Sequence, residues 1–250
     1  MREAATLPTT RDEDWRYADG DALAAFAPQA FDVWKEVTLA PGETRAKTLV
    51  LDGTGPELHR VHLTVGEGAR AEIFAINTGT DYLRLEVEVR LAKGAHFEFG
   101  GVTLGGTGTQ EFVTRVLHAE PDATSNQVVR SVQWGRSTGN FLGRIEVSPD
   151  AQKTDAAQNF KAMLLEAGAT ANAKPELEIF ADDVKCAHGA AIGALDDAAA
   201  FYMAARGLPP EAARKLLIRA FVADAFEAMS DEGEAAALLD KALEALGDAG

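Results

Sequence analysis

Cys186 and His188 carry the clearest chemistry in the sequence, because one residue separates them in the segment LEIFADDVKCAHGAAIG. If residues 184–188 are extended, side chains alternate between two faces, and Val184, Cys186 and His188 project to the same face. The thiol and the imidazole then lie roughly 6–7 Å apart along the strand. A thiolate and an imidazole together suit iron, zinc or copper.

Two ligands do not complete a metal site. An iron–sulfur cluster usually takes four, so the others must come from another chain or from residues such as His118, Glu166 and Glu178. Cys186 is the sole cysteine, which excludes an intrachain disulfide and a four-thiolate site built from this chain alone. On spacing alone, a buried free cysteine beside a polar histidine is the favoured interpretation of the pair.

Other patterns that could carry chemistry are weaker. The glycine-rich stretch FGGVTLGGTGTQ fits neither nucleotide-binding fingerprint, so it predicts strand turns and no nucleotide bound by this chain. No G-x-S-x-G nucleophile motif is present. Acidic residues at 12–14, 182–183 and 196–197 could include a catalytic carboxylate pair, but solvated turns and helix caps explain them better. We interpret three further histidines as structural or exposed: His59, His62 and His96.

Composition excludes several classes of protein. Apolar residues make up 46% of 250 residues and charged residues 25%, as in an ordinary globular chain. The net charge of −15 argues against binding to nucleic acid or to anionic lipid. The sequence contains no run of about 18 apolar residues, the length that predicts a membrane span. Its first residues lack the apolar core of a secretory signal. With one cysteine and no export signal, we expect a cytoplasmic protein.

The elements that must position Cys186 and His188 are mostly strands. Period-2 alternation is clearest at residues 83–91 and recurs at 61–65, 72–77, 96–103, 112–117, 127–134 and 141–147. Fragments rich in Gly, Asp, Asn and Pro separate these segments, and no amphipathic helix interrupts them. The pattern predicts an all-β sandwich, barrel or solenoid, and periodicity alone does not choose among the three.

The last part of the chain is alanine-rich and predicts three helices. Asp196 and Asp197 precede the first helix and Gly207 follows it, while Pro209 and Pro210 open the second. Ser230 is predicted to cap a third helix over residues 231–246. We expect these helices to pack together and against the strands or a partner. The apolar stripe of the second helix is Ile218, Phe221, Val222, Ala225, Phe226 and Met229.

Residues 154–229 closely resemble the SufD-like branch of the SufB/SufD family of iron–sulfur cluster assembly proteins. The shared pattern runs D-A-x-Q-x-N, then P-x-L-E-I-x-A-D-D-V-x-C-x-H-G-A-x-x-G, then a helical A-x-x-L-x-x-A-F element; EDWRY at 13–17 resembles the family's opening motif. Ala187 stands where many relatives have Ser, and the chain is much shorter than longer relatives. The matching residues are Asp155, Ala156, Gln158, Asn159, Pro175, Leu177, Glu178, Ile179, 181–184, Cys186, His188, Gly189, Ala190, Gly193, Leu195, Asp196, Phe201, Tyr202, Arg206, Gly207, Leu208 and 213–221.

The resemblance implies a mainly β protein with a right-handed parallel β-helix core. We expect an N-terminal arm with a short helical region at 1–40, the β-helix at 41–193, and a C-terminal helical domain at 194–250. Family membership implies a non-catalytic scaffold subunit that pairs with a SufB-like scaffold and is contacted by a SufC-like ATPase. Residues 155–165 would then form a late coil of the β-helix.

The resemblance also assigns roles to residues. Cys186 and His188 would hold a nascent iron–sulfur cluster shared with the SufB-like partner. Two alternatives stay open, namely a solitary β-solenoid enzyme acting on carbohydrate and a homodimer without metal. The residues that we expect to bind the ATPase are Leu195, Phe201, Tyr202, Arg206, Leu217 and Phe221.

Overall fold

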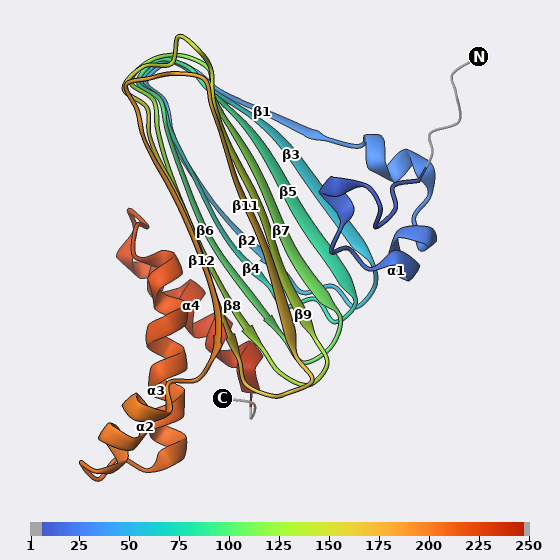
Figure 1. The fold of residues 1–250 in the computed structure, drawn as a ribbon, viewed down its shortest axis with the longest axis vertical. Coiled ribbons are helices and arrows are strands. Elements are labelled where there is room, and N and C mark those ends of the chain that lie inside the picture. The colour runs from blue at the N-terminus through green and yellow to red at the C-terminus, as the bar shows by residue number, and fades with distance from the viewer. Residues whose placement is uncertain (1–6, 248–250) are drawn as a thin grey trace.

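The computed structural model describes residues 7–247, which form a parallel β-solenoid followed along the chain by helices (Figure 1). Its twelve strands make two six-stranded sheets that face each other. Odd-numbered strands form sheet A in the order β1-β3-β5-β7-β9-β11, and even-numbered strands form sheet B in the order β2-β4-β6-β8-β10-β12. Each odd–even pair is one coil of about six, so the predicted β-solenoid is confirmed.

The strands lengthen along the chain, and from β5 onward each has ten residues. Strand β1 lies inside the range 1–40 predicted as an arm. Sheet A comprises β1 (Lys35–Leu39), β3 (Glu57–Val65), β5 (Tyr82–Leu91), β7 (Thr109–His118), β9 (Thr138–Val147) and β11 (Thr170–Ile179). Sheet B comprises β2 (Thr44–Leu51), β4 (Arg70–Asn77), β6 (His96–Gly105), β8 (Thr124–Gln133), β10 (Asp155–Leu164) and β12 (Lys185–Ala194).

The core lies between the two sheets, because every second side chain of each strand points into this space. In a parallel ladder, equivalent residues of successive coils stack on one another. Phe141 thus stacks on Phe112 of the preceding coil. Within one coil, the side chains of Phe141 in β9 and Phe160 in β10 face each other across the interior with ring centroids 5.8 Å apart. Five phenylalanines of this interior are fully buried, and each contributes about 2 kcal/mol or more of burial energy: Phe97, Phe99, Phe112, Phe141 and Phe160.

The turns from sheet A to sheet B are stacked like the strands. The backbone N–H of Gly68 donates to the Lys93 carbonyl at 2.9 Å, and that of Gly94 to the Pro121 carbonyl at 3.0 Å. Both glycines have φ near +60°, a conformation that costs other residues energy. The fragments GEGA and AKGA in which they lie are turns, as the sequence predicts, and they hold successive coils in register.

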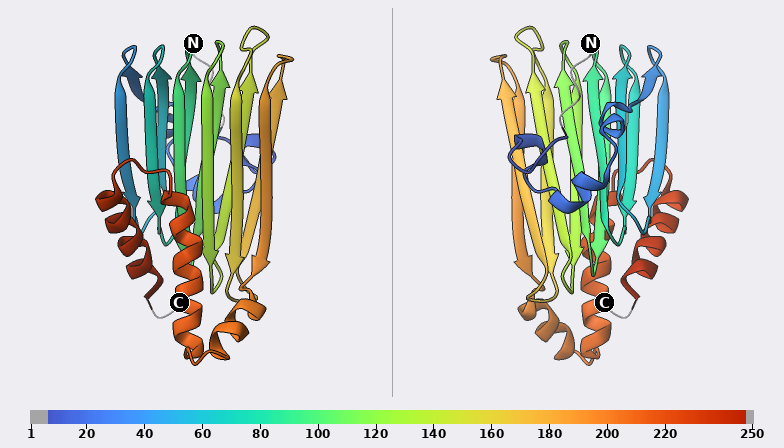
Figure 2. Two further views of the ribbon diagram at one scale, coloured as in Figure 1. Left: turned by 90° about the vertical axis from the view of Figure 1, so that its left-hand side faces the viewer. Right: turned by 90° about the vertical axis from the view of Figure 1, so that its right-hand side faces the viewer.

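The helices α3 (Pro210–Ala223) and α4 (Glu232–Leu246), with a 3₁₀ turn η3 (Asp224–Phe226), lie on the outer face of sheet B (Figure 2). Helix α2 (Asp197–Ala204) packs against α3. Ile218, Val222 and Phe226 are buried against that sheet, which confirms the predicted packing. The prediction that Ser230 caps the last helix is wrong. Asp231 accepts from two backbone N–H groups of α4 instead, while the Ser230 hydroxyl donates to Glu72 in β4 at 2.8 Å.

None of the helices between residues 7 and 247 is both long enough and apolar enough to cross a membrane.

An N-terminal arm covers the outer face of sheet A (Figures 1 and 2). It contains η1 (Glu13–Trp15), α1 (Gly20–Ala25) and η2 (Pro28–Asp32). The guanidinium of Arg84, fully buried in β5, stacks on the Trp15 ring at 3.7 Å and donates to the Asp14 carbonyl at 2.9 Å and to Glu111 at 2.7 Å.

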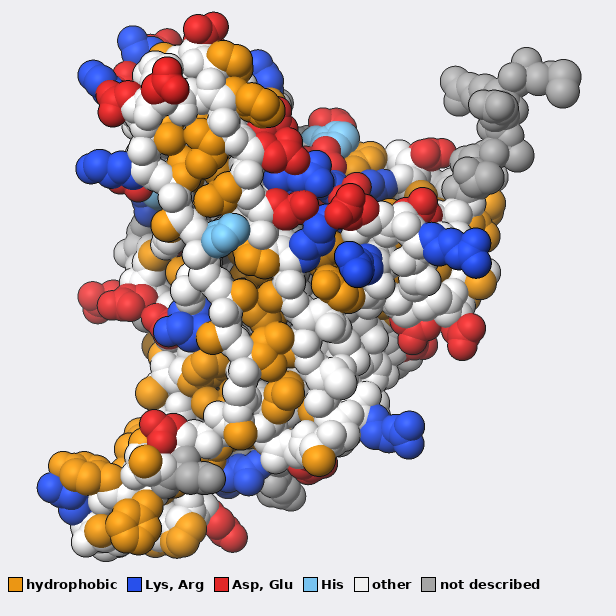
Figure 3. Space-filling view, in the orientation of Figure 1, with side chains coloured by type: hydrophobic (Ala, Val, Ile, Leu, Met, Phe, Trp, Pro, Cys, Tyr) orange, Lys and Arg blue, Asp and Glu red, His pale blue; other side chains and the backbone are white. Residues whose placement is uncertain are grey.

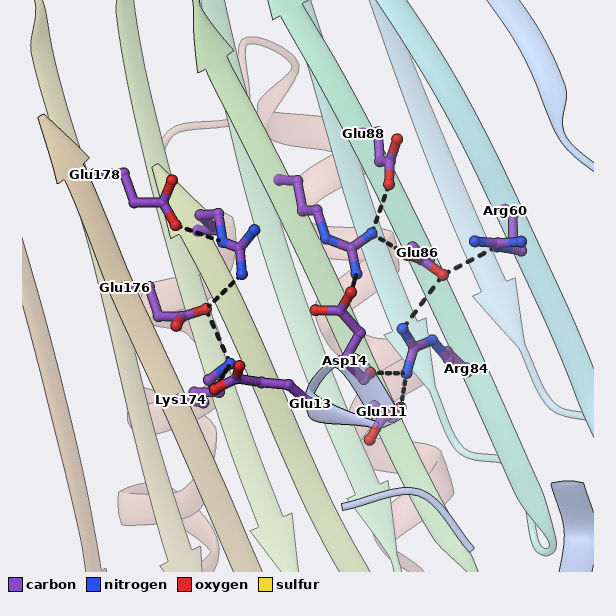
Figure 4. A network of polar contacts seen from close by, with 12 residues as sticks. Glu13, Asp14, Arg60, Arg84, Glu86, Glu88, Glu111, Lys174, Glu176 and Glu178 are labelled. Atoms are coloured by element: carbon purple, nitrogen blue, oxygen red, sulfur yellow. Dashed lines mark hydrogen bonds and ion pairs between the residues drawn. The ribbon is translucent and has the colours of Figure 1, made fainter. Parts of the chain in front are cut away.

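The acidic residues of the same motif pair with cations farther along the sheet. Glu13 pairs with Lys174 at 3.0 Å and Asp14 with Arg115 at 3.1 Å (Figure 4). The EDWRY motif therefore fastens the arm across sheet A, from β5 to the last strand, β11.

Removing the Trp15 ring should detach the arm. Trp15→Ala deletes a buried ring together with its cation–π contact to Arg84, so we expect a loss of about 3 kcal/mol in the free energy of unfolding. Val33→Ala is the control, because Val33 lies in the same arm but is 66% exposed. Urea unfolding measures both variants. Equal midpoints for the two variants would show that the arm is not held by Trp15.

Candidate functional site

Cys186 and His188 lie on β12, the last strand of sheet B. Their ladder partners on β10 are Ala156 and Gln158, both of which are buried between the sheets. Cys186 and His188 therefore belong to the face of β12 that points toward the interior of the solenoid. Their placement on one strand face follows the alternation expected from the sequence.

Among the described strands, β12 has only β10 as a neighbour in its sheet and β11 has only β9, so the solenoid is open beyond this last coil. The interior side chains of the last coil are consequently reached from outside. Cys186 is half-buried and His188 is exposed. Figure 3 shows hydrophobic side chains gathered between β11 and β12 at this open end. A thiol and an imidazole thus lie at the mouth of an apolar interior.

The Cys186 side chain packs against the core cluster that includes Ile145, Val147 and Ala156. This burial raises the pKa of the thiol, and the nearby Asp155 carboxylate adds to the rise. The thiolate is the form that binds metal and reacts as a nucleophile. Cys186 is therefore held as a thiol until a metal ion or a base removes its proton.

The other residues considered as ligands do not join this pair. His118 is buried in β7, where its Nε2 lies 2.9 Å from the Ser125 hydroxyl. Glu166 accepts from the Gly135 backbone N–H at 2.9 Å, and Glu178 pairs with Arg144 at 3.5 Å. Between residues 7 and 247, no three His, Cys, Asp or Glu side chains converge so that they could hold a metal ion. Of the two alternatives, further ligands from another chain or from these residues, the described structure therefore does not support the second.

A buried glutamine lies directly beneath His188 in the ladder. Gln158 is 2% exposed, and its Nε2 donates to the Glu176 carbonyl of β11 at 3.0 Å. Its Oε1 occupies space that Gly143 leaves free, since a Cβ at that glycine would come within 2.1 Å of the oxygen. The Gln of the D-A-x-Q-x-N element is the signal in the sequence for this residue, but its position under His188 depends on strand register.

The six residues expected to bind an ATPase fall into two groups. Phe201 and Tyr202 on α2 are 76% and 57% exposed, and the Arg206 guanidinium stacks on the Tyr202 ring at 3.6 Å. Leu195 and Phe221 instead pack partly buried against the core between the helices and sheet B. Leu217 is half-buried on α3. Of the six residues, Phe201, Tyr202 and Arg206 therefore form the surface that a partner can reach most freely.

Several of the acidic residues considered as a catalytic pair have structural partners. The side chain of Asp12 accepts from the Thr9 backbone N–H at 2.7 Å, and that of Asp196 accepts from two N–H groups at the start of α2. Asp14 pairs with Arg115. These contacts match the interpretation as turns and helix caps.

The buried His118 makes stability depend on pH. Burial lowers its pKa to about 4, from 6.5, so the unfolded state binds this proton first as the pH falls. The contribution is complete above about pH 6.5 and is lost toward about pH 4, a change of up to about 3 kcal/mol. His118→Gln, which cannot titrate, should lose less stability over this range in urea unfolding. Equal pH slopes in the two proteins would contradict burial of a neutral imidazole.

Comparison with known proteins matches this chain to a protein family. The family described as "SUF system FeS cluster assembly, SufBD core domain" matches residues 51–221, a range that holds ten of the twelve strands and most of α2 and α3. SufD of Escherichia coli K12 is 38% identical over 120 residues, which cover 48% of this chain and 28% of that protein.

Two further relatives extend the similarity. The chloroplastic protein ABCI7 of Arabidopsis thaliana is 39% identical over 121 residues, covering 48% of this chain and 25% of its own length. A SufBD family protein of Synechocystis is 31% identical over 175 residues, covering 68% of this chain and 39% of its own length. The matches thus span well under half of each relative. Because the family match covers most of the chain, including the strand that carries Cys186 and His188, the chain belongs to the SufB/SufD family of SUF iron–sulfur cluster assembly proteins.

Proposed function

We propose that this chain is a non-catalytic scaffold subunit that pairs with a SufB-like scaffold through its open end at β11 and β12. Cys186 and His188 would then contribute ligands to a nascent iron–sulfur cluster shared between the two subunits. The observation that carries the proposal is a pair of ligands at an open, uncharged solenoid end, in a chain whose described residues supply no third ligand. The cluster is cargo here, bound transiently and passed on.

The chemistry of the two solenoid ends supports pairing through the last coil. Unpaired strand edges invite association, and proteins block it with charges that point inward. The first coil has such charges, since Lys35 and Lys47 occupy inward positions in the ladders of β1 and β2. The last coil carries no Lys, Arg, Asp or Glu at its inward positions, which are Ala171, Ala173, Pro175, Leu177, Ile179, Cys186, His188, Ala190, Ile192 and Ala194.

The metal chemistry favours a shared site. A thiolate and an imidazole are sound ligands for iron, but a cluster usually needs four protein ligands. A partner subunit seated on β11 and β12 would bring its own side chains over Cys186 and His188. It would also exclude water from the apolar mouth around them. Both subunits would then be needed before the cluster could form.

The helical region is the proposed contact for a SufC-like ATPase. Its exposed apolar side chains include Phe201, Tyr202, Leu208 and Leu216, of which Phe201 is the most exposed. An apolar patch of this kind commonly marks a protein interaction site. The nucleotide would be bound by that partner. Hydrolysis there would shift the two scaffolds between states that expose or cover the cluster site.

Loss of the imidazole should impair cluster assembly without breaking the complex. In anaerobic co-expression of this chain with SufB-like and SufC-like partners, we expect His188→Ala to lower bound iron and sulfide about tenfold or more. Subunit recovery should not change. His59→Ala is the matched control, because His59 is exposed at the opposite end of the solenoid. Normal iron and sulfide in His188→Ala would refute the role of this histidine.

A charge placed inside the open end should prevent pairing. Ile192 is 47% exposed at an inward position of β12, so Ile192→Lys is expected to fold but to bury an unpaired charge when a partner docks. We expect co-purification with the SufB-like partner to fall about tenfold or more. Ala46→Lys, at an exposed outward position of β2, is the control. Undiminished pairing by Ile192→Lys would rule out this interface. If the chain alone forms a homodimer and Ile192→Lys dissociates it, a second copy can take the partner's place.

A further inference from the structure

The first coil of the solenoid is hollow, unlike the others. Its strands β1 and β2 have five and eight residues, and so they cover the interior incompletely. A cavity of about 500 Å³ opens between them and reaches inward to Leu85 of β5. This volume lies within the range of small-molecule sites in proteins. The cavity is at the opposite end of the solenoid from Cys186 and His188.

The floor of this cavity is aliphatic. It is formed by Val37 of β1, Leu49 of β2, Leu63 of β3, Ile73 of β4 and Leu85 of β5. Leu63, Ile73 and Leu85 are buried members of the main core. An aliphatic floor favours a flexible hydrocarbon chain, which gains by leaving water.

The walls, in contrast, carry basic residues at positions that are apolar in the next two coils. Lys35 aligns in the ladder with Val61 and Val87, and Lys47 aligns with Ile73 and Phe99. Two more basic residues follow the same pattern. Arg45 aligns with Ala71 and Phe97, and His59 aligns with Leu85 and Phe112.

Two of these four basic residues have no carboxylate partner among the described residues. Arg45 pairs with Glu43, and His59 pairs with Glu57 at 2.8 Å. Within residues 7–247, neither Lys35 nor Lys47 forms an ion pair with a carboxylate. The chain as a whole carries a net charge of −15, so this cationic opening is opposite in sign to the rest of the molecule. A site of this kind attracts an anion.

We propose that this cavity binds a linear aliphatic carboxylate, a free fatty-acid anion of medium length. Its hydrocarbon chain would lie between β1 and β2, and its carboxylate would pair with Lys35 and Lys47. A second copy of the chain is disfavoured, because it would bring two cationic openings together. An added strand is disfavoured as well, because the space lies between the sheets and the inward lysines oppose edge pairing.

The test is titration calorimetry of the full chain with dodecanoate below its micelle concentration. We expect saturable 1:1 binding, weakened about tenfold or more in the variant Lys35→Gln/Lys47→Gln. Lys93→Gln, which changes an exposed turn lysine, is the control and should bind as the unmodified chain does. Dodecyltrimethylammonium, with the same chain length and the opposite charge, should not bind.

Three results would overturn the proposal. They are no saturable binding of dodecanoate, equal affinity in the double variant, and equal binding of the cationic surfactant. Light scattering of the double variant completes the test. If the double variant self-associates while the unmodified chain binds no dodecanoate, the two lysines serve only to prevent strand pairing at the edges of β1 and β2, and the proposal is wrong. None of these measurements depends on iron–sulfur chemistry, so they stand apart from the function proposed above.

Discussion

The parallel hydrogen-bond ladder is the constraint on which the rest of this structure depends. Each strand of the solenoid satisfies its backbone groups with the strands of the coils before and after it. Stacking coils in this way builds a continuous core, but it leaves two ends whose strands have only one neighbour. The N-terminal arm and the C-terminal helices cover the outer faces of the sheets and do not close either end. The two ends are therefore the places where strand edges of the solenoid remain open to another chain.

The two ends have opposite chemistry. The first coil replaces core residues by cations such as Lys35 and Lys47, which oppose the addition of another strand. The last coil keeps apolar or small residues inward and adds a thiol and an imidazole among them. Burial raises the pKa of the Cys186 thiol, which favours its protonated form.

Much of this architecture could be predicted from local pattern. Alternation at residues 83–91 identifies β5, and glycine-containing turns separate the coils as expected. The alternation of side chains correctly places Cys186 and His188 on one face of β12. Capping by Asp196 also follows from the sequence, because a cap depends on neighbours in the chain.

The remaining features depend on contacts between distant residues, which a single sequence does not contain. Ladder register puts Gln158 beneath His188 and buries His118 away from the candidate site. The stacking of Arg84 on Trp15 joins residues that are far apart in the chain. Ser230 has good capping chemistry but is drawn to Glu72 of the sheet. Its neighbour Asp231 takes the cap instead.

The most direct test of this account is amide hydrogen exchange of the chain with and without a SufB-like partner. If the last coil is the pairing surface, exchange should slow in β11 and β12, including the amides around Cys186 and His188. The strands β1 and β2 at the other end should exchange as they do in the free chain. Protection of β1 and β2 instead, or no change in β11 and β12 within a stable complex, would contradict the assignment of the two ends.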